Sequence, residues 1–206
     1  MKIAKFILGN MQTNCYFIID EETKKCIVVD PADEFEVIVQ KLNDKGLTVD
    51  KIFLTHGHFD HMMALEKLRD RTGAPVYIGA EDNELLLDVD KSLMSFYGGV
   101  HTPCREADVL LKDNDTIDFC GNTIKVMHTP GHTKGSVCYL IGTDMICGDT
   151  LFRGSIGRYD FYGGDYQTIL ASLERIKALD IDYKIYPGHG ASSKLSYEKE
   201  YNLYMR

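Results

Sequence analysis

The sequence predicts an α/β fold in which two sheets pack together with helices on the outside. Short runs of β-branched and aromatic residues, which are typical of strands, fill much of each half of the chain. Segments with apolar residues at helical spacing follow strands in both halves, and such helices cover the sheets of a layered core. No repeat, low-complexity tract or linker interrupts the 206 residues, so we expect a single domain over 1–206.

The first half is expected to begin with a meander of strands and to continue with alternating helices and strands. Polar turns separate the three apolar runs that predict the meander, at 2–8, 14–20 and 24–30. The spacing of apolar residues then alternates between the helical and the strand period, which predicts helix 34–43, strand 49–55, helix 62–71, strand 76–78 and helix 80–87. A glycine follows each of the first two helices, as is typical of helix ends. The stretch 91–107 contains adjacent glycines and a proline, and we expect a loop there.

The second half is expected to contain short strands followed by helices. Apolar runs predict strands at 109–111, 116–119, 123–128, 136–141 and 145–147. Residues 153–165 are rich in glycine and aromatic side chains, which indicates an ordered loop rather than a linker. The remaining elements are expected to be a helix at 166–179, a strand at 184–186 and a terminal helix at 197–204.

Charge and composition disfavour two classes of protein. The 31 acidic and 23 basic residues give a net charge of −8, whereas a nucleic-acid-binding protein needs a basic surface. No apolar run reaches the ~18 residues of a membrane-spanning helix, and the N-terminal segment lacks the cleavage site of a secretory signal. We therefore expect a cytoplasmic protein without nucleic-acid or membrane partners.

The six cysteines form no C-x-x-C pair and show no zinc-finger spacing. Cys15, Cys26, Cys138 and Cys147 stand in apolar runs, where cysteine usually acts as a small buried hydrophobic residue. We expect structural thiols rather than redox centres, in agreement with a reducing compartment.

The strongest chemical signal is the segment THGHFDH at 55–61, which directly follows the apolar run KIFL. Three histidines and an aspartate fall within six positions there. In a strand these side chains would point to opposite faces, so they converge only in a tight loop. Imidazole and carboxylate groups suit zinc and iron. The segment therefore predicts a metal site with candidate ligands His56, His58, Asp60 and His61.

Three further segments each place one ligand-type side chain just after a predicted strand. His132 follows a Pro-Gly turn in TPGHT, Asp149 lies in GDT, and His189 lies in PGHG. Each segment alone is weak evidence. The repeated arrangement favours one site that loops at a sheet edge build together.

In this order, H-x-H-x-D-H, TPGHT, GDTLF and PGHG resemble the metallo-β-lactamase superfamily, and most of all its glyoxalase II-like branch of thioester hydrolases. The resemblance covers nearly the whole chain and implies a four-layer αβ/βα sandwich. It also implies two divalent metal ions, zinc in the first place, with iron and manganese as alternatives. The implied ligands are His56, His58 and His132 on one ion and Asp60, His61 and His189 on the other, with Asp149 bridging both.

The implied reaction is hydrolysis of a small-molecule thioester, as in glyoxalase II (hydroxyacylglutathione hydrolase). Two ions about 3.5–4 Å apart would lower the pKa of a shared water, and the bridging hydroxide would attack a polarised carbonyl. Asp60 is the expected catalytic residue, with two tasks: ligation of a metal and orientation of the hydroxide. A leaving thiolate is a weak base, so no strong general acid is required.

Five residues are candidates for contact with an anionic substrate: Lys134, Arg153, Arg158, Tyr159 and Tyr162. Arg158 and Asp160 can equally brace their loop.

Other polar residues beside the ligands have expected supporting roles. The hydroxyls of Thr55, Thr129 and Thr133 are expected to hold imidazoles or loop backbone. Asp30 stabilises a turn or supports a ligand, and His128 is expected to be structural or supporting. His101 is expected to be an exposed bystander.

The chain departs from the glyoxalase II pattern in two places. Met62 and Met63 stand where the branch has paired small residues. Glyoxalase II also carries a C-terminal helical domain with basic residues for the glutathione carboxylates, whereas only one predicted helix follows His189 here. Glutathione recognition is therefore not implied.

Other activities share these motifs. Persulfide dioxygenases of the superfamily keep the histidine-rich motif but bind one iron through positions that match His56, His132 and Asp149, and such an enzyme is the main alternative. A lactonase and a non-catalytic metal-binding protein are further alternatives. A secreted β-lactamase is disfavoured, because the expected export signal is missing.

Overall fold

The computed structural model describes residues 1–98 and 101–206, and the chain divides into two compact units. Unit 1 comprises residues 1–78 and 83–110, and unit 2 comprises residues 79–82 and 111–206. Each unit is built around a six-stranded sheet with helices, which confirms the predicted α/β class. Gly99 and Val100, within the predicted loop 91–107, lie outside the described residues.

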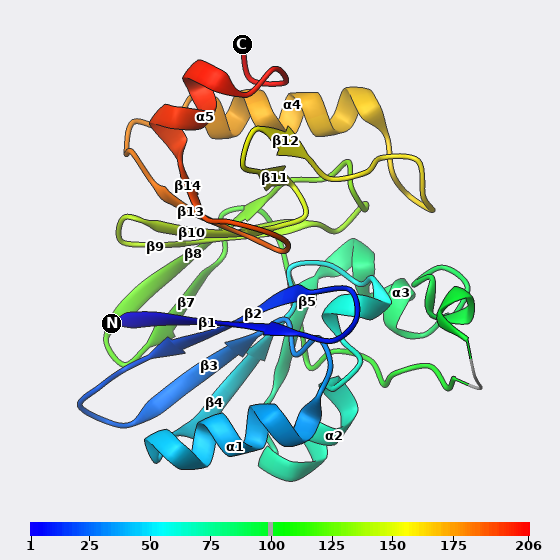
Figure 1. Cartoon of the computed structure of the whole chain (residues 1–206), viewed down its shortest axis with the longest axis vertical. Coiled ribbons are helices and arrows are strands. Elements are labelled where there is room, and N and C mark those ends of the chain that lie inside the picture. Colours follow the sequence, from blue (N-terminus) through cyan, green and yellow to red (C-terminus); the bar gives the residue numbers. More distant parts are fainter. Residues whose placement is uncertain (99–100) are drawn as a thin grey trace. The chain divides into compact units, whose positions relative to one another are not determined.

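The sheet of unit 1 begins with the predicted antiparallel meander and continues with parallel strands. Its strands, in spatial order, are β1 (Lys2–Leu8), β2 (Thr13–Ile19), β3 (Lys25–Val29), β4 (Thr48–Phe53), β5 (Val76–Gly79) and β6 (Val109–Leu111). Crossover helices connect the parallel strands, and α1 (Phe35–Lys45) and α2 (Leu65–Thr72) lie on the same face of the sheet (Figure 1).

The helices of unit 1 follow from apolar spacing and from their C-terminal glycines. Ile38 and Leu42 of α1 are buried against the sheet, one helical turn apart. Gly46 adopts φ 62° and donates its N–H to the carbonyls of Leu42 and Asn43, a left-handed helix end for which glycine is the best residue. The apolar face of α2 is buried through Leu65 and Leu68 in the same core.

The sheet of unit 2 places two predicted ligands on neighbouring strand ends. Its strands, in spatial order, are β14 (Ser193–Lys194), β13 (Lys184–Pro187), β10 (Asp144–Gly148), β9 (Val137–Ile141), β8 (Asn122–His128) and β7 (Thr116–Phe119). Strands β10 and β13 are parallel, and the Gly188 N–H donates to the Gly148 carbonyl over 2.8 Å. Asp149 and His189, the next residue of each chain segment, therefore leave the sheet side by side.

Two helices and a small hairpin complete unit 2. The hairpin consists of β11 (Leu151–Phe152) and β12 (Ser155–Ile156). Helices α4 (Tyr166–Lys177) and α5 (Leu195–Tyr201) lie on one face of the sheet (Figure 1). Asp165 caps α4, because its side chain accepts the N–H of Thr168 over 2.7 Å.

Several predicted helix boundaries were wrong. The helix predicted at 62–71 begins at Leu65, because Met62, which follows the 3₁₀ turn η1 (Phe59–His61), has a non-helical φ of −139°. The segment 80–87 is split into η2 (Ala80–Asp82) and α3 (Asn83–Leu86), and the loop 91–107 contains η3 (Met94–Tyr97). The terminal helix spans Leu195–Tyr201 instead of 197–204. It stops there because the buried Asn202 side chain donates to the Ser155 carbonyl over 3.0 Å.

Four cysteines occupy the buried positions that the sequence predicts. Cys15, Cys26, Cys138 and Cys147 are each 0% exposed. Burial raises the pKa of Cys138 to about 11 and that of Cys26 to about 12, so both thiols stay protonated near neutral pH. Among the described residues, no helix combines the length and the apolar composition that a membrane crossing requires.

Candidate metal centre

In unit 1, the segment after β4 turns back and gathers three imidazole rings. The ring centroid of His56 lies 4.9 Å from that of His58 and 4.1 Å from that of His61. The turn η1 is closed by the His61 N–H, which donates to the His58 carbonyl over 3.1 Å. All three side chains are buried. The predicted tight loop is therefore present, and it makes these side chains converge.

Asp30 sets the orientation of one of these rings. Its Oδ2 accepts a hydrogen bond from His61 Nδ1 over 2.9 Å, and its two oxygens also accept the Thr55 N–H and hydroxyl, each over 2.8 Å. The side chain is 0% exposed. With its proton on Nδ1, His61 presents Nε2 on the side of Asp60, whose Oδ2 is 3.7 Å away. Asp30 thus supports a candidate ligand, one of the two roles predicted for it.

In unit 2, one carboxylate oxygen lies between two imidazoles. Asp149 Oδ2 is 3.7 Å from His132 Nε2 and 3.6 Å from His189 Nε2. His132 donates from Nδ1 to the backbone carbonyl of Arg158 over 2.6 Å. This bond directs Nε2 of His132 toward Asp149, as the bond to Asp30 directs Nε2 of His61 in unit 1.

A buried carboxylate far away in sequence holds the turn that carries His132. Asp82 is 0% exposed and accepts the Thr133 hydroxyl over 2.7 Å and the Gly135 N–H over 2.6 Å. Thr133 also shares a 2.6 Å hydrogen bond with Ser136. The Thr133 hydroxyl therefore bonds to two side chains, and neither partner is the imidazole or loop backbone that was predicted. Sequence reasoning missed Asp82, since nothing in its neighbours indicates a partner some 50 residues later.

A close approach of backbones fixes the same region. A Cβ atom on Gly157 would lie 1.8 Å from the Asp149 carbonyl oxygen and 3.1 Å from His132 Nδ1. Only glycine fits at such a distance. The sequence analysis placed Gly157 in the glycine-rich loop 153–165 but found no signal for this packing role.

The donor set and its spacing fit metal ligation. Metal–nitrogen and metal–oxygen bonds of about 2.0–2.2 Å place two ligands of one tetrahedral ion roughly 3.3–3.6 Å apart. The Asp149 pairs, at 3.6 and 3.7 Å, and the Asp60–His61 pair, at 3.7 Å, are close to this spacing. They are too long for N–H···O hydrogen bonds, which end near 3.2 Å. The histidines and aspartates of each unit thus present donor atoms of metal-binding type.

Three of the five predicted substrate residues, Arg158, Tyr159 and Tyr162, lie in the loop after β12. The Arg158 guanidinium pairs with both oxygens of Asp160, over 2.9 and 2.8 Å, and lies 4.1 Å from the Phe161 ring centroid. Hydrogen bonds from Arg158 hold the pKa of Asp160 below its ordinary value. Arg158 thus braces its loop, the second of its predicted roles.

The other four candidates make aromatic contacts. Lys134 Nζ lies 3.3 Å from the Tyr162 hydroxyl, and Arg153 lies 5.2 Å from the Tyr197 ring centroid. The ring of Tyr159 packs on that of Tyr166, with centroids 4.8 Å apart.

The two remaining histidines have backbone partners. His128 Nε2 bonds to the Lys134 carbonyl over 2.8 Å and so supports the turn that carries His132. His101 Nε2 bonds to the Gly98 carbonyl over 2.5 Å. His101 is partly buried rather than exposed.

Comparison with known proteins gives full-length relatives. The model of the metallo-beta-lactamase superfamily matches residues 8–189. A probable metallo-hydrolase, YqgX of Bacillus subtilis, is 33% identical over 100% of this chain and 98% of the relative. The hydroxyacylglutathione hydrolase GloC of Haemophilus influenzae is 30% identical over 100% of this chain and 98% of the relative.

Solved structures show the same similarity. BLEG-1, a B3 metallo-beta-lactamase, matches with a TM-score of 0.93 and 33% identity over 99% of both chains. TTHA1623 in a di-iron-bound form matches with a TM-score of 0.86 and 32% identity over 98% of this chain and 99% of the other. ETHE1 from Myxococcus xanthus matches with a TM-score of 0.80 and 28% identity over 98% and 84%. The predicted fold family is confirmed, and the chain belongs to the metallo-beta-lactamase superfamily.

Proposed function

We propose that this protein is a binuclear metal-dependent hydrolase that cleaves small-molecule thioesters, as glyoxalase II does. The observation that carries the proposal is the position of Asp149 Oδ2, 3.7 Å from His132 and 3.6 Å from His189. A carboxylate that held both ions would lie near ligands of each, and these two histidines belong to different ions in the proposed ligand set. The full-length similarity to a hydroxyacylglutathione hydrolase supports a thioester as the substrate.

The proposed ligands follow the family motifs. Zinc is the proposed metal, and the di-iron form of TTHA1623 supports iron as the alternative. When bound, two such ions supply Lewis acidity and a water of lowered pKa. His56, His58 and His132 would hold one ion, Asp60, His61 and His189 would hold the other, and Asp149 would hold both.

Asp60 is the proposed catalytic residue, and its carboxylate is held in place. Thr13 donates its hydroxyl to Asp60 Oδ2 over 3.0 Å, which fixes the orientation of the carboxylate that is proposed to orient the attacking water. The water oxygen adds to the thioester carbonyl carbon, and the C–S bond then breaks with its electron pair leaving on sulfur. One proton of the water passes to solvent and the thiolate is protonated according to its own pKa. The products are a carboxylate and a thiol.

The substrate contacts belong to the same proposal. Lys134 and Arg153 are proposed to attract an anionic part of the substrate, with Tyr159 and Tyr162 beside them. Arg158 can contact the substrate only if its guanidinium leaves the Asp160 carboxylate and pairs with the anionic group of the substrate instead. The negative net charge of −8 supports the absence of a nucleic-acid partner, and the buried, protonated cysteines agree with a cytoplasmic location.

The test is release of thiol from a panel of S-acyl thiols by the zinc-loaded protein. We compare the wild type, Asp60→Ala and the control Asp44→Ala, since Asp44 is an exposed residue of α1. We expect the wild type and the control to hydrolyse thioesters. Asp60→Ala should lose hydrolysis while it still binds one ion per chain.

Three outcomes would overturn the proposal. One is wild-type turnover by Asp60→Ala. The second is oxygen uptake with a persulfide and no thioester cleavage, which would indicate the dioxygenase. The third is cleavage of β-lactams without cleavage of thioesters. β-Lactams are tested because the chain is similar to the metallo-beta-lactamase BLEG-1.

A further inference from the structure

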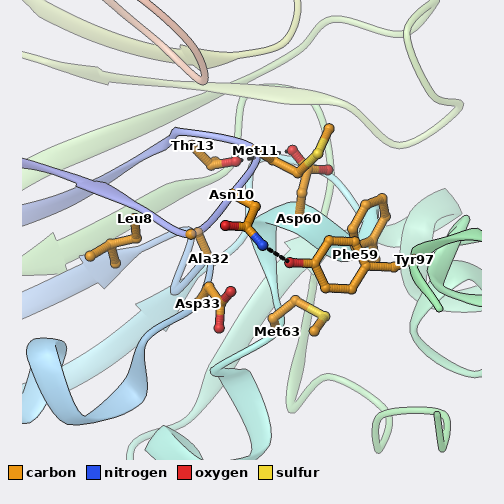
Figure 2. Close-up of a pocket in the computed structure, with 11 residues that line it drawn as sticks. Leu8, Asn10, Met11, Thr13, Ala32, Asp33, Phe59, Asp60, Met63 and Tyr97 are labelled. Carbon is orange, nitrogen blue, oxygen red and sulfur yellow. Dashed lines mark hydrogen bonds between the residues drawn. The ribbon is translucent and has the colours of Figure 1, made fainter. Parts of the chain in front are cut away.

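A small pocket opens beside Asp60, and all of its lining residues belong to unit 1 (Figure 2). Its walls come from the turn between β1 and β2, the segment before α1, the turn η1 with Met63, and η3. The empty space is about 180 Å³, including the open mouth. Because that figure counts the solvent at the mouth, the enclosed part is much smaller, and the pocket can take only one end of a substrate.

The walls are mainly apolar. Met11, Phe59, Met63 and Tyr97 line the pocket, and the rings of Phe59 and Tyr97 pack with centroids 5.0 Å apart. Methionine side chains are flexible and polarisable, so they adjust to different apolar groups. A short apolar chain is the ligand that such walls favour, because it loses no hydrogen bonds to water on entry.

Hydrogen bonds hold the pocket in shape. Asn10 Nδ2 donates to the Tyr97 hydroxyl over 3.3 Å and joins the β1–β2 turn to η3 (Figure 2). The Gly9 N–H donates to Glu34 Oε2 over 3.1 Å. A Cβ atom on Gly9 would lie 2.9 Å from Asp33, so the turn lies directly against the Asp33 side chain. The pocket is thus formed before any ligand enters.

The charges of the pocket are negative. Asp33 and Asp60 both line it, and the described lining residues include no lysine, arginine or histidine. A bound metal would offset the charge of Asp60, which is a proposed ligand. Asp33 lies at the other end of the pocket (Figure 2) and is partly exposed. Its charge therefore decides which ligands are repelled from that end.

We propose that this pocket is the acyl subsite of the enzyme, and that it selects short uncharged acyl groups while Asp33 disfavours acyl groups that end in a carboxylate. This assignment rests on the proposed function, because it places the attacked carbonyl beside Asp60. A thioester carries an acyl substituent on one side of that carbonyl carbon and the thiol on the other, and the proposal assigns the acyl side to the adjoining pocket.

The experiment uses acyl groups of different charge on one thiol. The substrates are the S-butanoyl and S-succinyl thioesters of N-acetylcysteamine, and the zinc-loaded enzymes are the wild type, Asp33→Asn and the control Asp44→Asn. Asp33→Asn keeps Oδ1, which accepts the Glu34 N–H over 2.7 Å, so the local turn is retained. We expect wild-type kcat/KM to be about tenfold lower for succinyl than for butanoyl. Asp33→Asn should remove most of this difference, and the control should leave it unchanged.

A binding measurement separates this proposal from the proposed function. The probes are the uncleavable S-butyl and S-(3-carboxypropyl) thioethers of N-acetylcysteamine, with Kd measured by calorimetry. The wild type should prefer the butyl probe about tenfold and Asp33→Asn should show little preference.

Each result decides one claim or both. If thioesters are cleaved and Asp33→Asn keeps the wild-type preference, the acyl subsite is wrong and the thioesterase stands. If Asp33→Asn changes the thioether preference but no thioester is cleaved, the thioesterase is wrong and the pocket stands as a site for uncharged groups. Absence of both cleavage and binding overturns both.

Discussion

At the scale of single residues, two imidazoles of the candidate metal centre have their proton placed by an oxygen acceptor. Asp30 accepts from His61 Nδ1, and the Arg158 carbonyl accepts from His132 Nδ1. Both rings therefore offer Nε2 for ligation. Such acceptors fix the orientation of the ring, and their loss typically lowers the metal affinity about 10–100-fold.

Asp30→Asn tests this role. The substitution keeps the size of the side chain but turns one buried acceptor oxygen into a donor that faces other donors. We expect the free energy of unfolding to fall by about 1–3 kcal/mol. We also expect affinity for the more weakly bound zinc ion to fall roughly 10–100-fold, measured by competition with a chelator. A folded Asp30→Asn protein with the zinc affinity of the control Asp44→Asn would contradict the role.

Residue types and spacing were enough to predict the ligand side chains but only some of their supports. Histidines and aspartates after strand ends are visible in a single sequence. Asp30 was left with two roles, because its contact with His61 depends on how β3 and the segment after β4 lie together. Asp82 was missed for the same reason, since Thr133 and Gly135 reach it only in the folded unit.

At the scale of elements, the hairpin β11–β12 packs directly against the ligand-bearing segments of unit 2. Gly157 follows this hairpin and touches the Asp149 backbone. Any side chain at this position must push the hairpin away from Asp149 and His132.

Gly157→Ala should therefore lower both stability and metal binding. Overpacking of this kind costs about 1–3 kcal/mol, and the shift of His132 should weaken zinc binding. The control is Gly154→Ala in the same hairpin, where an added Cβ meets nothing within 4 Å. The only loss of stability expected there comes from the positive φ of 72°, which costs a side chain about 1 kcal/mol. Calorimetric melting of the apoproteins and zinc titration give the two readouts. Equal zinc affinity in both variants would show that the close approach has no influence on the ligands.

A second element-scale prediction concerns acid stability. Asp113 accepts the His128 N–H over 2.8 Å and pairs with Arg175 over 2.9 Å at the end of β8. Partial burial raises the pKa of Asp113, but these two donors outweigh it and leave the pKa below its ordinary value. The unfolded chain then binds more protons, so the stabilisation is complete above pH ~4 and is lost as pH falls through the folded-state pKa.

Asp113→Asn should consequently destabilise the protein more at about pH 6 than at about pH 3. Urea unfolding at both pH values measures the difference, and Asp118→Asn, at an exposed position of β7, is the control. An equal loss of stability at both pH values would show that the charge of Asp113 contributes nothing.

Most strands and helices were predictable because their apolar spacing is local. The boundaries that failed depend on distant contacts. The start of α2 moves to Leu65 because the ligand loop ends in the turn η1, and α5 ends at Tyr201 because Asn202 bonds to the hairpin. Neither contact is visible in the periodicity of the helix itself.

At the scale of the whole molecule, the proposed ligand residues are distributed over the sequences of both compact units. Unit 1 contributes His56, His58, Asp60 and His61, and unit 2 contributes His132, Asp149 and His189. The single domain over 1–206 stays a prediction. If the chain is a single domain, it should melt in one transition, and the Tm of that transition should rise with the metal content.

Removal of metal tests this directly. A ligand at 1,000 times its Kd stabilises the folded state by about 4 kcal/mol. We expect the chelated protein to melt at a lower temperature in a single transition, and zinc to restore the original Tm. Two transitions, of which only one responds to zinc, would contradict shared ligation.

The most direct test of the central claim is the number of metal ions per chain. We would measure it by elemental analysis of protein purified without added metal or chelator. The binuclear hydrolase predicts about two ions per chain, of zinc or of iron. About one iron per chain would contradict it and favour the mononuclear dioxygenase, and a folded chain that neither holds nor takes up metal would contradict the metal centre itself.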